Sequence, residues 1–155
     1  MEERTAIDAT LKLTELTGIP IRWKTAKARD RNDGIDGYIE IGAGNDKITM
    51  VVEAKTTFHK SHLSYLIGLN ERYDDLLLLT TNLYEADKEL LRGANINYLD
   101  TAGNAYFKKD DFFIFIDGKR KKRHKSQFKI SFGDCPYNCS CFTQRFVINT
   151  KIFDI

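Results

Sequence analysis

The chain has 155 residues, of which 42% are hydrophobic and 30% are charged, and its formal net charge is +2. This length and composition fit one globular domain with a buried core, and they exclude a collagen-like or wholly disordered chain. No apolar run approaches the roughly 20 residues of a membrane helix, and the first residues lack the order of a signal peptide, so we expect a cytoplasmic protein that does not bind membranes.

The first third of the chain is predicted to form one helix followed by three strands. Apolar residues recur at helical spacing over residues 4–17, and Gly18 follows as a stop. Alternating apolar residues at 19–23 predict a strand, which Pro20 places near a sheet edge. Residues 35–41 and 47–55 predict two more strands, and the short turn-rich connection between them favours antiparallel pairing.

The next part of the chain is predicted to alternate helices and strands. Residues 58–73 have helical spacing, and the continuous apolar run 76–79 is typical of a strand buried on both faces in a parallel sheet. Asn82 and Glu85 have the spacing of a capping box for a helix that Gly93 ends. We therefore predict an α/β domain over residues 1–118, with a mixed β-sheet flanked by helices on both faces.

Short strands are expected at 96–99, 105–107 and 112–116, and the connection between the first two has two interpretations. Asp100, Thr101 and Asn104 all offer oxygen atoms, so this loop is a candidate ligand loop. The simpler interpretation, which we favour, is a tight turn in which Gly103 or Asn104 has a positive φ.

Basic residues are concentrated near the end of the chain. After residue 118 there are nine Lys and Arg against two Asp, whereas the first 118 residues carry fifteen Lys and Arg against twenty Asp and Glu. Most of the excess lies in residues 119–125, called the basic segment below. Such a segment either binds the phosphates of DNA without reading its sequence or serves as a solvated linker. Its candidate nucleic-acid-binding residues are Lys119, Arg120, Lys121, Lys122, Arg123 and Lys125.

A candidate metal site lies on the predicted hairpin. Glu53 and Lys55 are two residues apart on one strand, so their side chains project from the same face, and Asp36 begins the neighbouring strand. The carboxylates of Asp36 and Glu53, with the main-chain carbonyl of Ala54, would give the all-oxygen ligand set that Mg²⁺ prefers. With Lys55 to steady hydroxide or phosphate, this pattern suggests metal-assisted phosphodiester hydrolysis, although a polar strand face would carry the same charges.

The same residues, in helix–three strands–helix–strand order, resemble the PD-(D/E)xK restriction-endonuclease-like core. This resemblance implies that Asp36 and Glu53 are metal ligands and that Lys55 is the catalytic lysine. The Pro that usually precedes the first Asp is replaced by Ile35, and Asp33 is an alternative first ligand.

A second resemblance covers residues 5–125. Leu76–Thr81, Ile96–Tyr106 and Val52–Lys55 are similar to the corresponding stretches of AbiEi-type antitoxins of type IV toxin–antitoxin systems. The likeness implies a DNA-binding transcriptional regulator with a nuclease-like domain, and a nucleotidyltransferase-type toxin as its partner. Because such proteins usually continue into a winged-helix region, we interpret residues 126–155 as an irregular tail produced by truncation or a frame shift.

Three hypotheses about function follow from the sequence. The first is an antitoxin-like regulator with a nuclease-like core, the second an active Mg²⁺-dependent DNA endonuclease, and the third an interaction module with a vestigial site. The tail cysteines Cys135, Cys139 and Cys141, taken with His124, match no strong zinc template.

Two histidines and a group of aromatic residues are further candidates for contact with phosphate or nucleic acid. His59 and His62 either face the phosphate site or are ordinary polar residues of a helix start. Aromatic residues between 98 and 115 alternate with lysines, and they either contact nucleic acid or pack the core.

Overall fold

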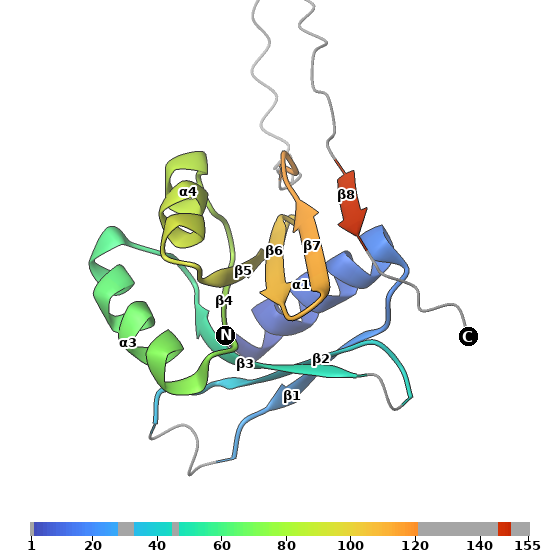
Figure 1. Ribbon diagram of the computed structural model, residues 1–155, viewed down its shortest axis with the longest axis horizontal. Helices are drawn as coiled ribbons and strands as arrows, with labels where there is room; N and C mark the ends of the chain where they lie inside the picture. The colour runs from blue at the N-terminus through green and yellow to red at the C-terminus, as the bar shows by residue number, and fades with distance from the viewer. Residues whose placement is uncertain (1, 28–32, 45–46, 121–145, 150–155) are drawn as a thin grey trace, which may run out of the picture.

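The computed structural model (Figure 1) describes residues 2–27, 33–44, 47–120 and 146–149. Its strands form one sheet in which the spatial order follows the chain order. The helices are α1 (Glu2–Thr17), α3 (Leu63–Tyr73) and α4 (Glu85–Gly93), with the short 3₁₀ turn η1 (Lys60–His62) directly before α3. The strands are β1 (Ile21–Thr25), β2 (Gly37–Ile41), β3 (Ile48–Lys55), β4 (Leu76–Thr80), β5 (Asn97–Asp100), β6 (Ala105–Lys109), β7 (Phe112–Ile116) and β8 (Phe146–Asn149).

The sheet is mixed, as predicted. The pairs β1–β2 and β2–β3 are antiparallel, β3–β4 and β4–β5 are parallel, and the pairs from β5 to β8 are antiparallel. The parallel strands therefore end at the same edge of the sheet. In the register, Lys55 is the partner of Thr80, and Thr80 is the partner of Asp100.

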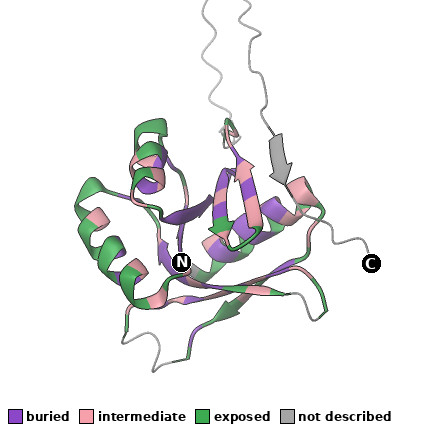
Figure 2. Cartoon of the chain, viewed as in Figure 1, coloured by how far each residue is buried: buried purple, intermediate pink, exposed green. Residues whose placement is uncertain are grey.

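Each face of the sheet has its own core. On one face, Ala9 and Leu13 of α1 pack against residues such as Met50, Val52 and Leu77. On the other face, a second cluster joins Leu66 and Leu69 of α3, Leu91 of α4, and Leu76, Leu78 and Tyr98 of the sheet. Figure 2 shows the consequence: the central strands are buried, whereas the outer surfaces of α3 and α4 are exposed.

The run 76–79 is apolar throughout because its residues alternate between these two cores. Leu77 and Leu79 belong to the α1 side, and Leu76 and Leu78 belong to the side covered by α3 and α4. The prediction of a strand buried on both faces is therefore confirmed, and so is the prediction of an α/β domain with helices on both faces of a mixed sheet.

Two local predictions differ from the structure. The capping box at Asn82 is wrong, because α4 begins at Glu85 with Tyr84 as its N-cap and no side-chain cap hydrogen bond. The main-chain carbonyl of Tyr84 accepts hydrogen bonds from the N–H groups of Asp87 and Lys88, so the helix starts two residues later than the motif requires. In addition, the tail that we expected to be irregular contains β8, which pairs with β7.

The turn after β5 has the conformation favoured from its sequence. Gly103 has a φ of 93°, and its N–H donates to the carbonyl of Asp100 at 3.0 Å. A Cβ at this position would lie 2.4 Å from a methyl group of Leu16, so glycine also lets the turn approach α1 closely. Over the described ranges, no helix has the length and apolar character needed to cross a membrane.

Candidate functional site

The structure brings Asp36 and Glu53 together through the β2–β3 pairing. The N–H of Asp36 donates to the carbonyl of Val52 at 2.9 Å, directly before the first residue of β2. The N–H of Ala54 in turn donates to Oδ2 of Asp36 at 2.8 Å. These two bonds fix the Asp36 carboxylate against the end of β3, beside the main chain on either side of Glu53.

Glu53 is a buried carboxyl group with a charged neighbour. Only 2% of the residue is exposed, and its Oε1 lies 2.5 Å from Nζ of Lys55. Burial raises the pKa of Glu53; the Lys55 ammonium opposes this effect, the Asp36 carboxylate adds to it, and the pKa is about 7. Glu53 is therefore a group whose charge at neutral pH depends on a nearby cation.

Lys55 is the cation of this cluster. Burial tends to lower its pKa, but the pair with Glu53 and the charge of Asp36 outweigh burial, and the pKa is raised. The side chain is about one-third exposed, so solvent reaches it. Lys55 thus remains an ammonium at physiological pH and can act as a hydrogen-bond donor and positive charge, not as a base.

Tyr65 of α3 is a further member of the site that the sequence did not reveal. The Lys55 Nζ lies 6.0 Å from the centroid of its ring, within the range of a cation–π contact. Burial and then the negative charge of Glu53 raise the pKa of the Tyr65 hydroxyl. Its only sequence signal is its place on the helix that follows the Glu53–Lys55 strand.

The carboxylates of Asp36 and Glu53 are suited to Mg²⁺. They are too few to hold a metal ion that takes all its ligands from protein side chains. Two adjacent carboxylates suit Mg²⁺, which keeps several waters and takes one or two carboxylates from the protein. Among the residues that the structure describes, no group of three His, Cys, Asp or Glu side chains is placed to hold a metal ion. The participation of the Ala54 carbonyl stays a prediction.

Of the other predicted site residues, Asp33, His59, His62 and the start of the basic segment lie within the described ranges. Asp33, the alternative first ligand, lines a neighbouring pocket over α3. His59 and His62 contact each other, with ring centroids 5.3 Å apart. Of the basic segment only Lys119 and Arg120 are described; residues 121–125 and the three cysteines lie outside the described ranges, so their predicted roles stay predictions.

The aromatic residues of β5 to β7 divide between core and half-buried positions. Tyr98 and Phe107 are fully buried, which shows that they pack the core. Tyr106 stacks on Tyr98 with centroids 5.8 Å apart and meets Phe113 and Phe115 edge-on. These contacts give the rings a structural role.

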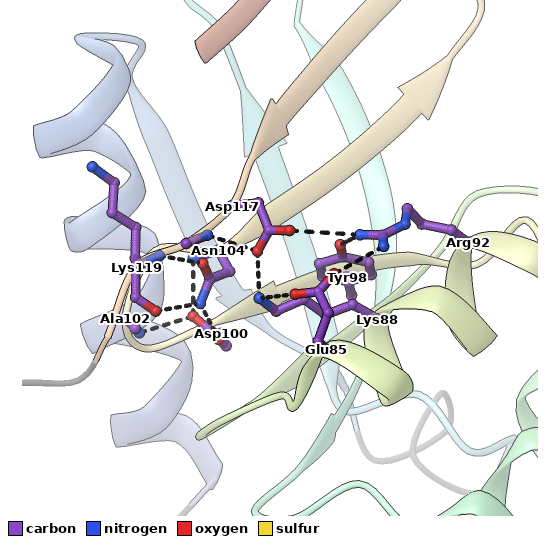
Figure 3. A network of polar contacts seen from close by, with 10 residues as sticks. Glu85, Lys88, Arg92, Tyr98, Asp100, Ala102, Asn104, Asp117 and Lys119 are labelled. Atoms are coloured by element: carbon purple, nitrogen blue, oxygen red, sulfur yellow. Dashed lines mark hydrogen bonds and ion pairs between the residues drawn. The ribbon is translucent and has the colours of Figure 1, made fainter. Parts of the chain in front are cut away.

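A second polar cluster, shown in Figure 3, holds the ends of β5 and β7 together. Asp100 accepts hydrogen bonds from the N–H groups of Ala102 and Asn104, at 2.9 Å each, and from the Asn104 side chain at 2.7 Å. The Asn104 side chain also bonds the main chain of Lys119, accepting from its N–H at 2.8 Å and donating to its carbonyl at 3.0 Å. The first residue of the basic segment is thereby fixed to the turn after β5.

Comparisons with models of protein families, with curated proteins and with solved structures find no match for this chain.

Proposed function

We propose that the chain is a DNA-associated regulatory protein of the antitoxin type, built on an α/β core that resembles that of PD-(D/E)xK endonucleases. The observation that carries the proposal is the position of Lys119, the first residue of the basic segment. Asn104 anchors Lys119 to the turn that follows Asp100, and the register places Asp100, Thr80 and Lys55 in one row at the edge of the sheet. The basic segment thus begins at the same edge as the Asp36–Glu53–Lys55 cluster.

This arrangement suits the binding of a polyanion. Lys55 is partly exposed at the sheet edge, and the basic segment adds most of the positive charge that follows residue 118. Contacts of Lys and Arg with phosphates supply most sequence-independent DNA affinity, because they release condensed counterions.

An active Mg²⁺-dependent endonuclease is the second candidate. It is favoured by the Asp36 carboxylate, which is close enough to Glu53 to raise its pKa, beside a lysine that remains charged. Asp36 and Glu53 would hold the ion, which when bound would activate water and neutralise charge on the phosphate oxygens. Lys55 would position the scissile phosphate by donating hydrogen bonds to it.

DNA binding in EDTA should separate the two candidates. We expect the wild type to bind duplex DNA without metal, with an affinity that falls steeply as salt rises, because each phosphate contact contributes a slope of about −0.9 in a plot of log K against log salt. Replacing the six basic residues at 119–123 and 125 with Gln should remove most of this affinity, whereas Glu53→Ala should leave it within about twofold. Fluorescence anisotropy at several salt concentrations measures both effects.

Plasmid nicking in Mg²⁺ or Mn²⁺ is the complementary assay. Nicking that disappears in Lys55→Ala and in Glu53→Ala would establish the endonuclease in place of the regulator. Failure of the wild type to bind DNA under any salt condition would refute both. The toxin partner implied by the family resemblance stays a separate prediction, which a pull-down that survives high salt and nuclease treatment would test.

A further inference from the structure

A pocket of about 490 Å³ lies beside the candidate site, between residues 33–34 and the exposed face of α3. Tyr65 belongs to both places, because it lines the pocket and its ring lies 6.0 Å from Nζ of Lys55. A ligand in the pocket would therefore be adjacent to any phosphate held by Lys55.

Gly68 keeps this pocket open. It lies inside α3, where a glycine destabilises the helix relative to alanine. A Cβ at Gly68 would meet no atom within 4 Å, so packing within the described chain does not require a glycine here. Because Gly68 lines the pocket, a longer side chain at this position would occupy the space.

Gly34 fixes the opposite wall. Its φ is 84°, a conformation that favours glycine, and a Cβ here would lie 2.4 Å from the hydroxyl oxygen of Tyr65. The main chain at Gly34 consequently touches the end of the tyrosine side chain. This contact holds Tyr65 as a wall of the pocket while 46% of the residue remains exposed.

The groups around the pocket have the chemistry that a nucleotide requires. Arg72 lies in the last turn of α3 and has no ion-pair partner within the described ranges, so its guanidinium is available for a phosphate. The ring of Tyr65 offers a surface on which a base or sugar can stack. The Asp33 carboxylate can accept a hydrogen bond from an N–H group of a base, such as N3–H of thymine, and its negative charge disfavours a bare anion.

We propose that this pocket binds one nucleotide of a DNA strand, next to the phosphate contacted by Lys55. The inference rests on the proposed function, since it assumes that the chain binds DNA. It adds a specific subsite, formed by Tyr65, Gly68 and Arg72, to the sequence-independent contacts of the basic segment.

The test compares substitutions at two helix glycines, at each of which an added side chain would meet no other atom within 4 Å of its Cβ. Gly68→Gln fills the pocket, and Gly93→Gln is the matched control, because a Cβ at Gly93 of α4 also meets nothing within 4 Å. Binding of a single-stranded oligothymidylate of about 8 nucleotides is measured by fluorescence anisotropy in EDTA. We expect Gly68→Gln to weaken binding about tenfold, because stacking of one base contributes about 1–3 kcal/mol, and Gly93→Gln to change it less than twofold.

Two further readouts locate the nucleotide. Arg72→Gln should reduce the salt slope of oligonucleotide binding by about 0.7, the value for one single-strand phosphate contact. An oligonucleotide carrying 5-iododeoxyuridine should form a photo-crosslink to Tyr65, which mass spectrometry of the digested wild type would identify. Gly68→Gln and Gly93→Gln should both unfold at a higher temperature than the wild type, because glycine destabilises a helix. A loss of binding in a variant with this higher unfolding temperature is not caused by a loss of folding.

The outcomes distinguish this inference from the proposed function. If the wild type binds the oligonucleotide and Gly68→Gln binds it equally well, the subsite is refuted and DNA binding stands. If the wild type binds neither the oligonucleotide nor duplex DNA, the proposed function and the subsite fail together.

Discussion

Glu53→Gln should abolish a large pH dependence of stability. In EDTA, the free energy of unfolding of the wild type should fall relative to that of the variant by roughly 3 kcal/mol as pH rises from about 4.5 to about 7. The sign follows from burial, which raises the pKa of the folded carboxyl above its unfolded value of 4.5. Over that range the folded state binds more protons than the unfolded state, so raising the pH removes stability.

Urea denaturation of both proteins at intervals between pH 4 and pH 8.5 measures this difference. Glu40→Gln is the control, because hydrogen bonding to Lys24 outweighs burial and lowers the pKa of Glu40. Glu40 should therefore lose its stabilising contribution as pH falls, the opposite direction to Glu53. If the free energies of unfolding of the wild type and Glu53→Gln differ by the same amount at every pH, the prediction is wrong, and Glu53 has the same pKa in the folded and unfolded states.

The convergence of Asp36, Glu53 and Lys55 was predictable because it depends on local chain geometry. Asp36 is 18 residues from its hydrogen-bond partner Ala54, and a hairpin spans that separation without help from distant parts of the chain. The two-residue period of a strand then determines that Glu53 and Lys55 share a face. The burial of Glu53 was not predictable, because it depends on the side of the sheet that α3 and α4 cover.

Other features of the site depend on tertiary contacts that leave little trace in the sequence. Tyr65 joins the cluster only because α3 packs across β3 and β4, and its exposed position resembles that of any surface tyrosine. Asn82 shows the converse error: the capping-box spacing is present, but the chain becomes helical only at Glu85. A short motif of this kind indicates where a helix can begin. Tertiary packing of the segment determines where the helix begins in the folded protein.

Lys88→Ala should lower the free energy of unfolding by about 3 kcal/mol at pH 7, because it leaves a partly buried carboxylate without its main partner. Lys88 is 5% exposed on α4, and its ammonium contacts the carboxylate of Asp117 and lies 3.3 Å from that of Glu85 (Figure 3). Burial raises the pKa of Asp117, but Lys88, the N–H of Gly118 and Arg92 outweigh it and lower the pKa. Asp117 is thus ionised in the folded protein and needs a cation.

Two comparisons isolate the buried pair from the general effect of removing a lysine. Lys12→Ala removes an exposed partner of Glu15 and should change stability by less than about 1 kcal/mol. Adding Asp117→Asn to Lys88→Ala should recover part of the lost stability, because no unpaired carboxylate then remains. Thermal and urea unfolding of the four proteins measure these differences. A loss in Lys88→Ala no larger than that in Lys12→Ala would mean that Arg92, 3.9 Å from Asp117, suffices as its partner.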